Sequence, residues 1–166
     1  MNTFLIALFA FVAILALTSW VASRPRGRQL HGLVNVAEGF QPAIRTLLTD
    51  AAIATRYLLV KRGSDAAHVA LAGTADVPIG FVTDEASAAE EGIAVAHFGL
   101  LREGALGVAS GAIAADEFLV PGANGTVRKL PVAAGTYHII GRATKAAADT
   151  AVVEYTPSFP IQRVVA

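Results

Sequence analysis

The amino-acid sequence predicts an all-β protein: an antiparallel sandwich or small barrel with an extended N-terminal arm and an apolar helix ahead of that arm. After residue 55, nine apolar runs of four to eight residues follow one another, and turn residues separate them. Only residues 86–91 and 143–148 look locally helical, and both segments are short. The first 23 residues carry no charged side chain and therefore form a different kind of segment.

An uncharged segment precedes the β region. Residues 4–21 are apolar apart from Thr18 and Ser19, and as a helix they would span roughly 27 Å, close to the hydrocarbon thickness of a bilayer. Trp20 stands where an aromatic side chain meets a membrane interface. The sequence therefore predicts a helix within residues 1–23 as a candidate membrane anchor or assembly helix. Its candidate contact residues are Phe4, Leu5, Leu8, Phe9, Phe11, Val12, Leu15 and Trp20.

Three arginines follow this segment at once: Arg24, Arg26 and Arg28. They form a candidate basic flank of the kind that contacts anionic lipid. No Lys or Arg precedes the apolar run, whereas secretory signal peptides carry a basic region there. The positive-inside rule then places the body of the protein in the cytoplasm. A cleaved signal peptide, a helix buried in an assembly and an extension from a misassigned start codon remain as alternatives.

Residues 24–54 are expected to form an arm or linker, because glycine and proline interrupt any regular element there. The interrupting residues are Pro25, Gly27, Gly32, Gly39 and Pro42. Residues 42–48 fit a short helix, since proline is tolerated in the first turn. We therefore expect an extended arm that contains one helical turn.

Residues 55–166 are expected to form a single β domain. The apolar runs lie at 56–61, 68–72, 79–83, 93–98, 105–109, 117–120, 126–130, 136–142 and 151–156. Their spacing is typical of an antiparallel sandwich or small barrel. Asn124-Gly125, between two of these runs, is a tight-turn signal.

Composition excludes several classes of function. The chain has 13 basic and 13 acidic side chains, and without the three arginines of the flank residues 29–166 are mildly acidic. This argues against nucleic acid as a partner. There is no cysteine, which excludes disulfides, thiolate catalysis and cysteine-based zinc sites.

No motif indicates an enzyme, a metal or a cofactor. Three of the four histidines, His68, His97 and His138, lie in predicted strands, but no metal-ligand spacing joins them. The acidic pairs at 84–85, 90–91 and 116–117 sit at predicted turns, where solvated charge is the simpler interpretation. The glycines of residues 104–111 fit neither a phosphate loop nor a dinucleotide fingerprint, and Ser110 lacks a nucleophile elbow.

Three segments resemble the capsid cement (head decoration) proteins of tailed phages. They are TDAAIATRYLLVKRGSDAAHVALAG at 49–73, PIGFVTDEA at 78–86 and the whole of residues 109–160. Their order is collinear with the family over about residues 49–160. The chain departs from the family in its uncharged N-terminal segment, and at Asp116 and Thr150, where a glycine often stands in the family.

The resemblance implies a β-barrel or β-tulip protomer without catalytic activity. It would bind the major capsid protein on the outer surface of a phage head, as a homotrimer, and stabilise the head lattice. Many weak contacts on a repeating lattice resist opening together. The protein would then belong to the virion and be assembled in the host cytoplasm, with membrane association through residues 4–21 as a further expectation.

Two other classes of function remain open at this point. A membrane-anchored or pilus-like surface structural subunit would place the apolar helix in a bilayer or a filament core. A small hydrolase or ligand-binding barrel would need a converging polar pocket. Neither a pilin-type glutamate near the start of the helix nor a basic leader is present in the sequence.

Overall fold

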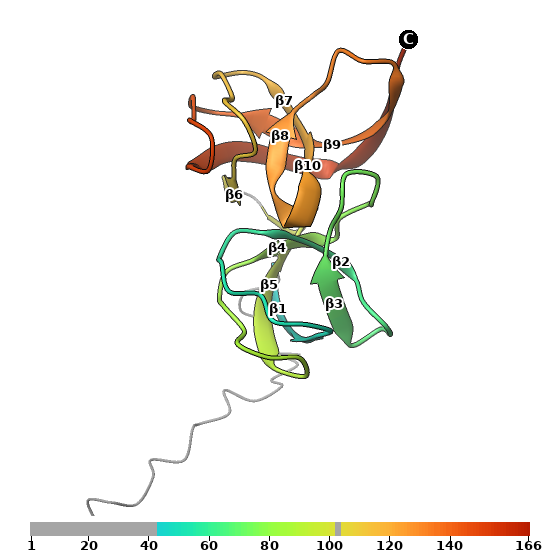
Figure 1. The fold of residues 1–166 in the computed structure, drawn as a ribbon, viewed down its shortest axis with the longest axis vertical. Coiled ribbons are helices and arrows are strands. Elements are labelled where there is room, and N and C mark those ends of the chain that lie inside the picture. Colours follow the sequence, from blue (N-terminus) through green and yellow to red (C-terminus); the bar gives the residue numbers. More distant parts are fainter. Residues whose placement is uncertain (1–42, 102–103) are drawn as a thin grey trace, which may run out of the picture. The chain divides into compact units, whose positions relative to one another are not determined.

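The computed structural model describes residues 43–101 and 104–166, whose fold is shown in Figure 1. The elements of this part of the chain are β1 (Ile44–Thr49), β2 (Leu59–Arg62), β3 (His68–Leu71), β4 (Gly80–Val82), β5 (Gly92–His97), β6 (Ala105–Val108), β7 (Phe118–Pro121), the 3-10 turn η1 (Ala123–Gly125), β8 (Val127–Lys129), β9 (Gly135–Ala143) and β10 (Val152–Val165). The apolar helix predicted over residues 1–23, its basic flank and most of the predicted arm lie outside the described residues. Within the two described ranges, no helical segment has the length and apolar character that a membrane crossing requires.

The all-β prediction is confirmed, since each of the nine predicted runs overlaps one of the strands β2 to β10. Two local predictions are wrong. Ile44–Thr49 is strand β1 and not part of a helical turn, because it pairs with β5 along its whole length, from Ile44↔Ala96 to Leu48↔Gly92. Residues 86–91 and 143–148 form bends and turns around isolated bridges instead of short helices. Long-range pairing overrides local helix propensity at both places.

Strands β1 to β5 close a barrel in the order β1-β3-β2-β4-β5. The strand missed by the sequence analysis closes it: β1 pairs antiparallel with β5 and parallel with β3, through Leu48↔His68 and Thr49↔Val69. The barrel is therefore antiparallel except at this one junction. Its interior is filled by branched apolar side chains from all sides: Ile53, Val60, Val69, Val82, Ile93 and Val95.

Strands β6 to β10 form a second, five-stranded antiparallel sheet in the order β6-β10-β9-β7-β8. Its buried side chains belong to one hydrophobic cluster with side chains of the barrel residues, among them Leu59, Phe81 and Phe98. The turn η1 adds a backbone contact, because the N–H of Gly125 donates to the carbonyl of Ala72 over 2.7 Å.

The barrel and the second sheet share a local plan. Ile53 and Ala86 exchange backbone hydrogen bonds of 2.8 and 2.9 Å, and Ile113 and Ala147 exchange two of 2.9 Å in the same way. Sixty positions apart, residues 52–60 and 112–120 carry the same residue at five places: Ala, Ile and Ala at the start, Leu and Val at the end. The shared bridges and side chains indicate that one supersecondary unit occurs twice in the chain.

Two turns of the second sheet hold non-glycine residues in a backbone conformation that glycine favours. Asp116 and Thr150 have φ angles of +67° and +63°, the left-handed region that glycine enters without steric cost. The chain thus keeps the turn geometry of a glycine at both places. Asn124 and Gly125, with φ of +52° and +76°, confirm the predicted tight turn.

Candidate interaction surfaces

The described residues hold no group of three or more His, Asp or Glu side chains arranged to bind a metal ion. His68 and His97 lie in the barrel and His138 lies on β9, so the strand histidines do not converge. The three acidic pairs lie between strands, as predicted. His31 lies outside the described residues.

A shallow hollow of about 520 Å³ lies on the second sheet around the bridge of Ile113. Its walls are mainly methyl groups, from Ala112, Ala114 and the three alanines at 146–148, with Glu117 and Lys129 as its charged members. The carboxylate of Glu117 is already occupied, because it accepts the backbone N–H of Ala114 over 2.8 Å. Ligand pockets combine enclosure with a few converging polar groups, and the hollow offers neither.

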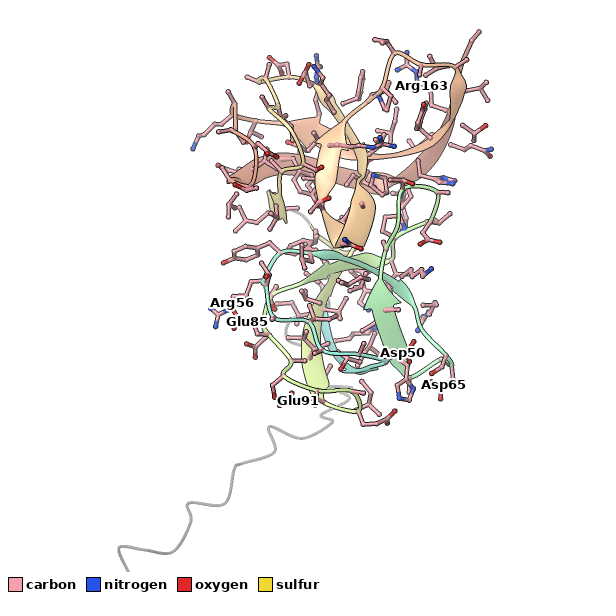
Figure 2. All side chains as sticks on the ribbon, viewed as in Figure 1. Asp50, Arg56, Asp65, Glu85, Glu91 and Arg163 are labelled. Atoms are coloured by element: carbon pink, nitrogen blue, oxygen red, sulfur yellow. The ribbon has the colours of Figure 1, made fainter. Side chains whose placement is uncertain are left out.

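Carboxylates gather at one end of the barrel, where the β2–β3 and β4–β5 turns meet the end of β1. We call Asp50, Asp65, Glu90 and Glu91 the acidic rim; Figure 2 shows Asp50, Asp65 and Glu91 at this end. Asp50 accepts hydrogen bonds from the backbone and the hydroxyl of Ser64, at 2.8 and 2.7 Å. The acidic rim therefore also stabilises the turns that carry it.

His68 joins two members of the acidic rim. Its Nδ1 lies 2.6 Å from the carboxylate of Asp65, and its Nε2 lies 3.1 Å from that of Glu90. Hydrogen bonds to Asp65 and then Glu90 favour the charged imidazolium and raise the pKa of His68 to about 9. The same contact lowers the pKa of Asp65. His68 thereby connects the β2–β3 turn to the β4–β5 turn.

This connection predicts a pH dependence on the alkaline side. The folded pKa of His68 lies above its unfolded value of about 6.5, so the charged ring stabilises the fold fully below that pH. The stabilisation is lost as the pH rises through about 9. In an NMR titration, the His68 imidazole should titrate near pH 9, and Glu90→Gln should move this transition toward neutral pH.

His97 provides an internal control in the same titration. Burial, with the charges of Arg45 and Arg62 nearby, lowers the pKa of its imidazole, so it should titrate below its ordinary value. Glu90→Gln should leave that transition unchanged. A His68 transition near pH 6.5 in the unmodified protein would contradict the bridging geometry.

The far part of the β9–β10 hairpin forms a second surface. Gly135–Ile139 pairs with Ile161–Val165, and within the described residues no further strand pairs with either segment. We call this two-stranded segment the ribbon. Four apolar side chains on it or beside it are exposed: Val132 (96%), Phe159 (66%), Ile161 (59%) and Val164 (70%). A two-stranded ribbon with exposed apolar side chains is typical of a surface that meets a partner.

Arginines surround an exposed aromatic ring next to the ribbon. The guanidinium carbons of Arg142 and Arg163 lie 5.4 and 5.6 Å from the centre of the Phe118 ring. Arg142 also approaches the carboxylate of Asp116, at 3.7 Å. Among the described residues, no carboxylate lies within ion-pair distance of Arg163, which Figure 2 labels. Arginine and aromatic side chains are the residue types most enriched at protein interfaces.

The sequence analysis did not identify the ribbon as a site. One signal was available: residues 118–142 and 155–166 contain no Asp or Glu, although three arginines and a lysine lie there. Arg142 and Arg163 are 21 positions apart in the sequence, so they form one surface only when β9 and β10 pair.

Comparison with known proteins finds a solved structure with a similar fold. No protein-family model matches the chain, and no curated protein matches it. A solved structure, the head fiber gp8.5 N base of bacteriophage phi29, is similar to it with a TM-score of 0.54 and 16% sequence identity. The similarity covers 70% of this chain and 94% of the phage chain. At this level of identity the two chains share a fold.

Proposed function

We propose that the protein is a structural component of a phage virion and binds the outer surface of the head as a cement or decoration protein. The observation that carries the proposal is the likeness to the base of a phage head fiber, which extends over 94% of that chain. The collinear resemblance to cement proteins over residues 49–160 supports the same conclusion from an independent direction. The similar fold and the collinear sequence segments thus both favour a position of this protein on the outside of a phage head.

The proposed partner is the major capsid protein, and the proposed assembly is a homotrimer. A small β domain offers only a modest contact area, so its binding to a single capsid subunit would be weak. Several copies held together engage several lattice positions at once, and the effective concentration then raises the overall affinity. The proposed role is mechanical, with no catalytic step.

Head binding can be measured directly. Purified heads that lack the protein are mixed with the full-length chain, and the bound protein is quantified after sedimentation through a cushion. We expect saturable binding, with a stoichiometry fixed by the lattice, and a rise in the temperature at which the heads release DNA. Heads of an unrelated phage serve as the control. Absence of binding to intact, undecorated heads would overturn the proposal.

A further inference from the structure

We infer that the ribbon docks on the acidic rim of a second copy of this chain, so that copies associate head to tail. The inference concerns the chain itself and stands apart from the proposed head binding. It starts from the ribbon, whose paired segments carry exposed apolar side chains and whose outer edges pair with no described strand. Such an edge presents unpaired backbone donors and acceptors to a partner.

Charge decides which partner fits. The strands that make and support the ribbon, within residues 118–142 and 155–166, carry Arg128, Lys129, Arg142 and Arg163 without a single acidic side chain. Arg128 donates to the carbonyl of Pro121 and lies over the Tyr137 ring, so its charge also has no carboxylate partner here. Arg142 already has the carboxylate of Asp116 as a neighbour, at 3.7 Å, so Arg128 and Arg163 are the arginines of this surface that carboxylates of a partner can neutralise.

The same ribbon of another copy does not meet this requirement. Symmetric pairing of two ribbons through β10 would bring Arg163 of one copy toward Arg163 of the other, and like charges facing each other are destabilising. The apolar side chains alone would have to overcome this repulsion. Two identical cationic ribbons are thus a poor match.

The barrel of a second copy does meet it. Residues 43–101 hold seven acidic and four basic side chains, whereas residues 104–166 hold four acidic and five basic ones. Four of the seven carboxylates make up the acidic rim, and the charged His68 between two of them leaves the rim with an excess of negative charge. The side chains of Asp65 and Glu90 remain 60% and 72% exposed beside His68. The rim is an acidic protein surface that every copy supplies, and complementary charge also speeds encounter between copies.

A contact between two different surfaces of the same chain is heterologous. Such a contact leaves one ribbon and one rim free on every open assembly, so copies continue to add until a ring closes. A closed ring of three copies is one solution and agrees with the proposed homotrimer. Opposite charges set which two surfaces meet, and the angle between successive copies sets how many copies close the ring.

The test measures self-association of the full-length chain by sedimentation velocity, with one non-ionic detergent used throughout. We expect association at ~0.05 M NaCl and weakening at ~0.5 M NaCl, since salt screens exposed charges. Arg163→Glu should weaken association by about tenfold or more, and the double variant Arg163→Glu with Glu90→Arg should restore most of it. Restoration identifies the rim as the partner surface.

Lys145→Glu is the matched control. Lys145 is an exposed cation in the bend after β9, outside the ribbon, and is paired with Glu154 at 3.1 Å. Its reversal should change association by less than about twofold. The inference is overturned if the chain stays monomeric, or if Arg163→Glu and salt leave the association unchanged. It is also overturned if Arg163→Glu abolishes head binding but not self-association, since the ribbon would then face the capsid. If the unmodified chain does not bind heads but still associates in a salt-sensitive way, the proposed function alone is overturned.

Discussion

Gly80→Ala is expected to lower the free energy of unfolding by about 3 kcal/mol, because a methyl group there has no room. Gly80 is the first residue of β4, paired with His97 on β5 and with Val60 on β2. A Cβ at this position would overlap the backbone carbonyl of Ala96. A carbonyl within a closed barrel cannot swing away as a side chain can, so β4 and β5 would have to separate. Urea denaturation followed by circular dichroism measures the loss.

Gly92→Ala is the matched control in the same barrel. Gly92 begins β5, and a Cβ there would lie 3.4 Å from the nearest atom, the Cγ2 of Thr46, which is ordinary van der Waals contact. The substitution should be neutral or stabilise by up to about 0.5 kcal/mol through the unfolded chain. Equal stability of the two variants would show that β4 and β5 do not approach as closely as described.

Tyr155→Ala is expected to destabilise the second sheet by about 3–5 kcal/mol, the range for deleting a buried aromatic ring. Tyr155 on β10 is fully buried and is the largest such side chain in the described residues. Its ring lies against two glycines, since a Cβ at Gly141 would come within 2.8 Å of it and one at Gly107 within 3.3 Å. Neither glycine has a side chain that could fill the resulting cavity. Thermal and urea unfolding both measure the effect.

Tyr155→Phe measures the contribution of the hydroxyl to stability separately from that of the ring. Burial raises the pKa of the phenol, and no described residue forms a hydrogen bond with its oxygen. A buried, unpaired hydroxyl costs about 1–3 kcal/mol, so its removal should leave the stability unchanged or raise it by about 1 kcal/mol. A clear loss of stability in Tyr155→Phe would mean that the hydroxyl has a partner within the sheet.

The positions of the strands were predictable from the sequence because local signals mark them. Apolar runs such as 93–98 end at glycine or at charged turn residues, and the structure places β5 at Gly92–His97. Strand β1 was missed because Pro42 and nearby glycines suggested an arm, and half of its side chains are exposed. Only its partners on β5 and β3 make it a strand, and partners are not visible in a local window.

The candidate surfaces were less predictable than the strands. The acidic pair at 90–91 was correctly placed at a turn, yet its connection to His68 depends on a turn-to-turn contact across 22 positions. The cluster of Arg142, Arg163 and Phe118 likewise requires β7, β9 and β10 to lie side by side. No spacing along the chain encodes such a cluster.

Composition and local pattern were sufficient for the all-β class and the turn at Asn124-Gly125, because these depend on neighbouring residues alone. Closure of the barrel by β1, the second sheet and the cationic ribbon depended on which distant strands share hydrogen bonds. Backbone donors and acceptors are nearly the same at every residue, so pairing is selected by the burial of whole faces, which emerges only when the chain is folded.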